Sequence, residues 1–106
     1  MGFFAYLLGT DSKSPGAHDI AKYRHITRNK IYQILHSIRI SSLTKEKEKI
    51  IEDEITKHLL SNSTISLKVI RRVLSDLVRE KSINNIDKKY IYQAFEEYFF
   101  NNKENN

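Results

Sequence analysis

Residues that form tight turns are scarce in this chain, which holds three glycines and one proline among 106 residues. Sheets need such residues at their turns, whereas helices can be joined by Ser, Asn and Thr. Two of the glycines and the proline fall within residues 9–16, which read as a loop. The composition therefore favours an all-α fold, and the absence of Cys excludes disulfides and thiolate metal sites.

Apolar side chains recur at helical spacing in four segments, which predict helices over 17–40, 45–60, 67–81 and 88–100. The first helix can break near Thr27, whose hydroxyl can cap a second segment. Ile50 and Leu60 are additional candidates for the buried face. The side chains expected to face the core are Ile20, Tyr23, Ile31, Ile34, Leu35, Ile38, Ile51, Ile55, Leu59, Ile70, Val73, Leu74, Leu77, Val78, Ile91, Ala94, Phe95, Tyr98 and Phe99.

The three later helices are each preceded by a residue that can cap a helix N-terminus. Thr44 and Ser66 stand directly before the second and third helices, where a hydroxyl can accept a backbone N–H. Asp87 stands at the same position before the fourth helix. Ile86 and Ile91 have the spacing of a hydrophobic staple around that cap. The boundaries of these helices are therefore expected at the capping residues.

Four amphipathic helices with one apolar stripe each must share a core, which predicts a small four-helix bundle built from two αα-hairpins. We expect residues 1–16 to form a hydrophobic leader and loop, residues 17–100 a single helical domain, and residues 101–106 a polar, disordered tail. The apolar run from Phe3 to Leu8 is far shorter than the roughly 20 residues of a membrane span. It also lacks the flanks of a secretory signal. The expected location is therefore cytoplasmic, and an integral membrane protein is not expected.

No combination of residues in the sequence has the spacing of a catalytic site. The carboxylates of residues 45–57 alternate with lysines, and ion pairs such as Asp53 with Lys57 account for them. Phosphate-binding glycine loops and a Gly-x-Ser-x-Gly elbow are missing. We therefore expect no enzymatic activity, no cofactor and no metal. Metal-ligand spacing is also missing among the four histidines, which are His18, His25, His36 and His58.

The third expected helix places basic side chains opposite its apolar stripe. Lys68, Arg71, Arg72 and Arg79 face outward there, in a chain with a formal net charge of +5. Residues 66–83 thus resemble the recognition helix of winged-helix DNA-binding proteins, which implies nucleic-acid binding in the major groove. An ordinary amphipathic bundle helix has the same pattern.

Two features depart from the winged-helix family. The link from Leu60 to Ser66 is longer than the usual tight turn. The residues after Ile83 form a cap and a helix, where that family has a β-wing.

Aromatic residues gather at both ends of the chain. Phe3 and Phe4 lie near the start, and Phe99 and Phe100 end the last helix. Adjacent helical residues point about 100° apart, so one of Phe99 and Phe100 must pack on the leader, stay exposed or meet a partner.

The sequence as a whole favours a non-enzymatic helical interaction module in a regulatory or adaptor role. Its expected partner is a protein, bound through Phe3, Phe4, Phe99 and Phe100. The alternative is DNA binding by the basic face of residues 67–81 in a helix-turn-helix-like manner. Self-association is left open.

Overall fold

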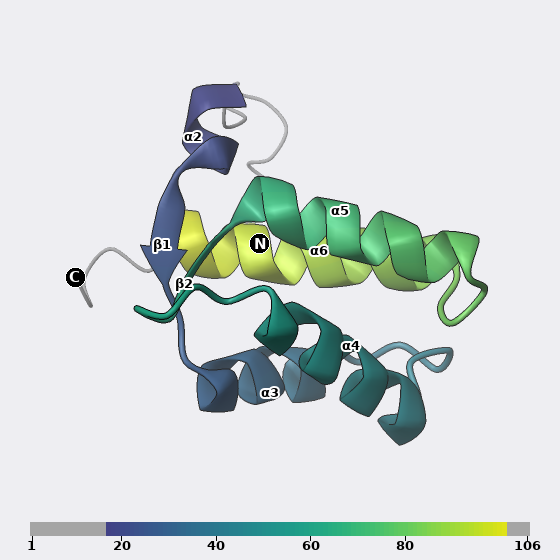
Figure 1. The fold of residues 1–106 in the computed structure, drawn as a ribbon. Coiled ribbons are helices and arrows are strands. Elements are labelled where there is room, and N and C mark those ends of the chain that lie inside the picture. The colour runs from purple at the N-terminus through teal and green to yellow at the C-terminus, as the bar shows by residue number, and fades with distance from the viewer. Residues whose placement is uncertain (1–16, 102–106) are drawn as a thin grey trace.

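The computed structural model describes residues 17–101, which form five helices and one two-stranded sheet (Figure 1). The expected mostly helical class is confirmed. The expected leader and the tail from residue 102 onward lie outside the described residues. In chain order the elements are α2 (Ala17–Ala21), β1 (Tyr23–His25), α3 (Arg28–Ser37), α4 (Lys45–Lys57), β2 (Thr64–Ser66), α5 (Leu67–Arg79) and α6 (Asn85–Asn101).

The single helix expected over 17–40 is wrong, because a strand interrupts it. The chain leaves α2 after Ala21, runs extended through β1 and re-enters a helix only at Arg28. Thr27 caps α3 as expected: its Oγ1 accepts the backbone N–H of Lys30 at 3.1 Å. Pairing with a distant strand overrides the local helical pattern here, and Tyr23, expected inside, is 46% exposed.

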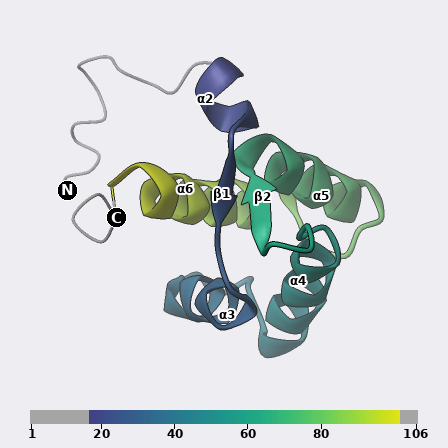
Figure 2. The same cartoon turned by 60° about the vertical axis from the view of Figure 1, so that its left-hand side comes forward.

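The two strands lie side by side and form a small antiparallel sheet (Figure 2). In its register Arg24 lies opposite Ile65. A turn precedes β2, with the Leu60 N–H donating to the Thr64 oxygen at 3.0 Å. Within this turn Ser63 has a φ of 61°, a left-handed conformation that is uncommon for residues other than glycine. Ile65 is completely buried at the centre of β2. The sheet therefore joins the segment before α3 to the segment before α5.

The four longer helices enclose the core. Helix α3 packs against α4 and α6, and α5 packs against the same two helices. Figure 1 shows α5 and α6 in one layer and α3 and α4 in the other, with the sheet at one end. The expected neighbours α3 with α4 and α5 with α6 do touch, but a fifth helix and the sheet depart from a plain four-helix layout.

The expected apolar stripes account for most of the core. Three residues named as candidates for it, Tyr23, Ile50 and Leu60, are instead exposed. Ile20, Ile38, Leu59, Val78, Ala94 and Tyr98 are partly buried against the core. The expected residues that are buried are Ile31, Ile34, Leu35, Ile51, Ile55, Ile70, Val73, Leu74, Leu77, Ile91, Phe95 and Phe99.

The caps of α4 and α5 are those expected. The Thr44 hydroxyl accepts the Lys47 N–H at 3.2 Å, and the Ser66 hydroxyl accepts the Val69 N–H at 3.1 Å. The expected boundaries of both helices are therefore correct at their N-terminal ends.

The expected cap of α6 is wrong by three residues. Asn84 is the N-cap: its Oδ1 accepts the Asp87 N–H at 2.7 Å, while Asp87 Oδ2 accepts the Asn84 N–H at 3.1 Å. This reciprocal pair is a capping box with Asp87 in the first turn. Ile86 is consequently 59% exposed and forms no staple, and Ile83 is the buried residue before the cap.

Candidate functional site

The outer face of α5 carries the basic residues expected there. Lys68, Arg71, Arg72 and Arg79 are all exposed. Arg71, Arg72 and Arg79 lie three, four and eleven residues after Lys68, spacings that place all four along one side of a helix. The opposite side of α5 is buried. The helix is therefore strongly amphipathic, with apolar side chains packed in the core on one side and charged side chains exposed on the other. The residues of that buried side are Leu67, Val69, Ile70, Val73, Leu74 and Leu77.

Three of these four cations have no carboxylate partner in the part of the chain that the structure describes. Arg79 pairs with Asp76 one turn earlier on the same helix. Within residues 17–101, Lys68, Arg71 and Arg72 form no ion pair with a carboxylate. We call these three residues the basic face of α5. The structure thus separates Arg79 from the other members of the expected set.

A shallow groove runs between α5 and α6 on the Arg71 side of the basic face. Its volume is about 400 Å³. Two additional cations, Lys88 and Lys89, line it from the first turns of α6, and neither forms an ion pair within the described residues. The complete lining of this α5–α6 groove is Arg71, Asn85, Lys88, Lys89, Tyr92, Gln93 and Glu96.

Two half-buried titratable groups lie in the α5–α6 groove. Burial raises the pKa of the Glu96 carboxyl above its ordinary value. Burial also raises the pKa of the Tyr92 hydroxyl, as does the charge of Glu96, while the charge of Arg71 acts in the opposite direction. Tyr92 therefore lies close enough to both Arg71 and Glu96 to be affected by their charges.

The α6 side of the groove was missed by the sequence reasoning. Asn85, Lys88, Lys89, Tyr92 and Glu96 recur at helical spacing, so their common face was visible in the sequence. That this face borders the basic face of α5 follows only from the antiparallel packing of the two helices.

The aromatic residues expected to bind a protein do not form one exposed surface in the described part of the chain. Phe99 is buried in the core. Phe100 is half-buried, and the Arg24 guanidinium carbon lies 4.7 Å from its ring centroid, at cation–π distance. Phe3 and Phe4 lie outside the described residues.

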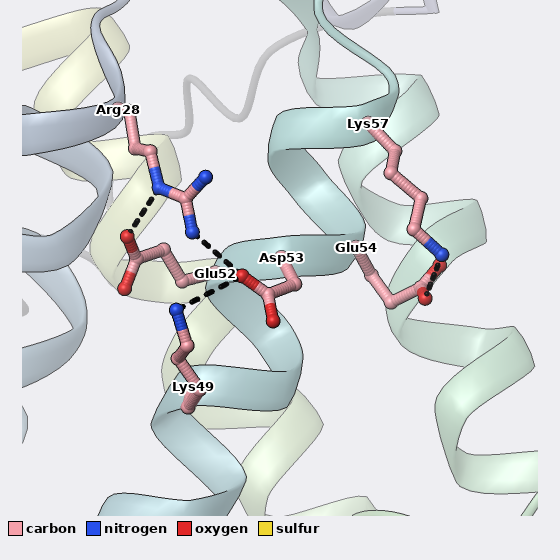
Figure 3. A network of polar contacts seen from close by, with 6 residues as sticks. All are labelled: Arg28, Lys49, Glu52, Asp53, Glu54 and Lys57. Atoms are coloured by element: carbon pink, nitrogen blue, oxygen red, sulfur yellow. Dashed lines mark hydrogen bonds and ion pairs between the residues drawn. The ribbon is translucent and has the colours of Figure 1, made fainter.

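The carboxylates of α4 serve as ion-pair partners (Figure 3). Arg28 of α3 reaches Glu52 and Asp53, each at 2.6 Å, and so links the two helices. The expected ion pair between Lys57 and Asp53 is wrong, because Lys57 pairs with Glu54 at 2.8 Å. These are exposed or partly exposed contacts, which contribute little stability.

Asp87 is a fully buried carboxylate that joins α6 to the loop before α4. Ser42 donates its hydroxyl to Oδ1 at 2.5 Å, and Lys47 Nζ lies 3.0 Å from Oδ2. Burial acts to raise the pKa of Asp87, but the hydrogen bonds from Ser42, the Asn84 N–H and Lys47, with the charge of Lys47, bring that pKa below its ordinary value. The sequence reasoning had assigned Asp87 only to a cap.

The described histidines are dispersed. His36 Nδ1 lies 3.4 Å from Glu48 Oε1, and its ring stacks on Tyr32 with centroids 5.4 Å apart. His58 Nδ1 lies 2.9 Å from the backbone oxygen of Glu54. Across residues 17–101, the structure contains no cluster of three metal-ligating side chains.

None of the helices in the described part of the chain is both long and apolar enough to span a bilayer. Comparison with protein-family models, curated protein sequences and solved structures found no match to this chain.

Proposed function

We propose that this chain is a non-enzymatic binding module whose partner is a nucleic acid, contacted through the basic face of α5. The observation that carries the proposal is the set of three exposed cations, Lys68, Arg71 and Arg72, that have no ion-pair partner within the described residues. Lys88 and Lys89 extend this charge onto α6. A cluster of such cations is the usual contact surface for phosphates.

The sequence favoured a protein partner, whereas the exposed cations support a proposal of nucleic acid. Of the four aromatic residues that were to bind it, Phe99 is buried and Phe100 is half-buried. A protein partner remains a prediction, because Phe3 and Phe4 lie outside the described residues. We keep the cytoplasmic location as part of this proposal. It is a compartment in which the protein would meet nucleic acid.

The mode of binding differs from the helix-turn-helix alternative. The link between α4 and α5 contains a turn at Ser63 and the strand β2, where that motif has a tight turn. We therefore propose that the basic face of α5 contacts phosphates, and that α5 does not insert into a major groove. Such binding has little sequence preference and weakens steeply with salt.

A titration of labelled oligonucleotides followed by fluorescence anisotropy tests the proposal. The parent protein is expected to bind at about 50 mM salt and to release the oligonucleotide as salt rises. The variant Arg71→Ala/Arg72→Ala should bind more weakly, and its plot of log K against log salt should be flatter by about one unit per lost phosphate contact. Both side chains are exposed, so folding should be unaffected.

A control with the same change in net charge separates position from overall charge. Lys45→Ala/Lys49→Ala removes two cations from α4, beside Tyr32 and His36 of α3. This control is expected to bind nearly as the parent does. The proposal fails if the parent does not bind at low salt, or if both double variants lose affinity equally. If the protein binds no nucleic acid but binds another protein independently of salt, the protein partner that the sequence favoured is supported.

A further inference from the structure

The α5–α6 groove offers more than positive charge. Beside the cations Arg71, Lys88 and Lys89 it contains the ring of Tyr92 and the amides of Asn85 and Gln93. Phosphates alone need only the cations. An aromatic ring and amides at the same place are the groups that stack on a base and hydrogen-bond to its edge.

We propose that the α5–α6 groove binds one nucleotide unit of a single-stranded nucleic acid, with the phosphate at Lys88 and Arg71 and the base against Tyr92. This inference rests on the proposed function and names the part of the nucleic acid that the groove recognises. The groove is shallow and open, with a volume of about 400 Å³, so one nucleotide unit would lie against its surface and would not be enclosed.

The charges along α6 differ between the two ends of the groove and so orient the bound nucleotide. Lys88 and Lys89 lie near the N-terminal end of the helix, and Glu96 lies eight residues after Lys88, about 12 Å further along the axis. A phosphate is therefore favoured at the lysine end and opposed near Glu96. The base then lies toward Tyr92 and Glu96, where a carboxylate can accept a hydrogen bond from an exocyclic amino group.

A single strand fits this arrangement better than a duplex. Bases within a duplex are stacked and paired, so their faces are closed to a tyrosine ring. In single strands the faces are open, and stacking on an aromatic side chain adds affinity at each base. The groove should therefore prefer single strands, whereas the basic face of α5 alone has no reason to do so.

The test compares labelled single strands of about 12 nucleotides, in DNA and RNA, with the same DNA sequence as a duplex. We expect the parent to bind the single strands more tightly. Tyr92→Leu keeps apolar volume at the half-buried position but removes the aromatic face, and should weaken single-strand binding by about 5-fold to 150-fold. Tyr92→Phe keeps the ring and should bind as the parent does.

Two additional variants examine the charges. Lys88→Ala/Lys89→Ala should weaken binding and flatten the salt dependence. Glu96→Gln keeps an acceptor oxygen for the base but removes the charge that opposes the phosphate, and should strengthen binding. Urea unfolding of each variant confirms that the fold is intact. Free AMP at the concentration of the strand should not displace it, because a single nucleotide in the groove lacks the strand's contacts to Lys68 and Arg72.

Failure of this inference is distinguishable from failure of the proposed function. The inference is overturned if the parent binds through Arg71 and Arg72 while Tyr92→Leu and Lys88→Ala/Lys89→Ala bind as tightly as the parent. Equal affinity for the duplex would also overturn it, as would displacement of the strand by free AMP. If the parent binds no nucleic acid at all, both proposals fall together.

Discussion

Replacing Asp87 with alanine is expected to destabilise the fold strongly, although the residue lies at the start of a helix. The carboxylate is fully buried and receives hydrogen bonds from Ser42, Lys47 and the Asn84 N–H. Its removal therefore leaves three donors without their acceptor. It also unlinks α6 from the loop that leads into α4.

The magnitude follows from these contacts. A hydrogen bond to a charged group contributes about 1.5 to 3 kcal/mol, and removing one member of a buried ion pair costs about 3 to 5 kcal/mol. Lys47 keeps 27% of its side-chain exposure and a 2.9 Å bond to the Ser42 backbone oxygen, so it is not stranded. We therefore expect a loss of about 2 to 4 kcal/mol in the free energy of unfolding.

Urea unfolding followed by circular dichroism measures this loss. Asp87→Asn keeps the volume and one acceptor and should cost less than Asp87→Ala. A loss below about 0.5 kcal/mol for Asp87→Ala, the range of ordinary surface substitutions, would refute the reasoning.

The pH dependence gives an independent check on the same carboxylate. Its pKa is lower in the folded protein than its ordinary value. The stability it contributes is therefore complete above the unfolded pKa of about 3.9 and is lost as the pH falls through the folded pKa. The difference in stability between the parent and Asp87→Asn should accordingly narrow in strong acid. If the difference in stability between the two proteins stays constant into strong acid, the lowered pKa of Asp87 is contradicted.

Five additional substitutions test the core and the caps by urea unfolding. Leu74→Ala and Phe95→Ala should each cost about 2 to 5 kcal/mol, because both side chains are fully buried. A change below about 0.5 kcal/mol in either would mean that the residue is not in the core. Thr27→Ala should cost about 1 kcal/mol by removing the cap of α3, and an unchanged midpoint would argue against that cap. Ile83→Ala should destabilise the protein far more than Ile86→Ala, whose side chain is exposed, and the reverse order would restore the cap at Asp87.

The helices that the sequence predicted best are those in which a clear apolar stripe and a local cap agree. For α5, the period of the apolar residues and the hydroxyl of Ser66 both mark the same start. Such local signals depend only on nearby residues. They do not require knowledge of the rest of the fold.

The elements that the sequence reasoning missed depend on distant partners. Residues 23–25 form a strand because Thr64–Ser66 lies beside them, and three residues are too few to show an alternating pattern. At α6 the sequence predicted the cap at Asp87. The structure has it at Asn84, where Ile83 packs into the core just before the helix.

The candidate site divides in the same way. The outward direction of Arg71 and Arg72 followed from the stripe of one helix. The contribution of Lys88, Lys89 and Tyr92 could not be inferred, because it depends on how two helices pack side by side.

The most direct test of the central claim is a titration of the ¹⁵N-labelled protein with a single-stranded oligonucleotide, followed by heteronuclear NMR. The account predicts salt-sensitive shift changes concentrated on α5 and the first turns of α6, at Arg71, Arg72, Lys88 and Tyr92. Signals from Lys45 and Lys49 of α4 should remain in place. Shift changes centred on α3 and α4, or no change at low salt, would contradict it.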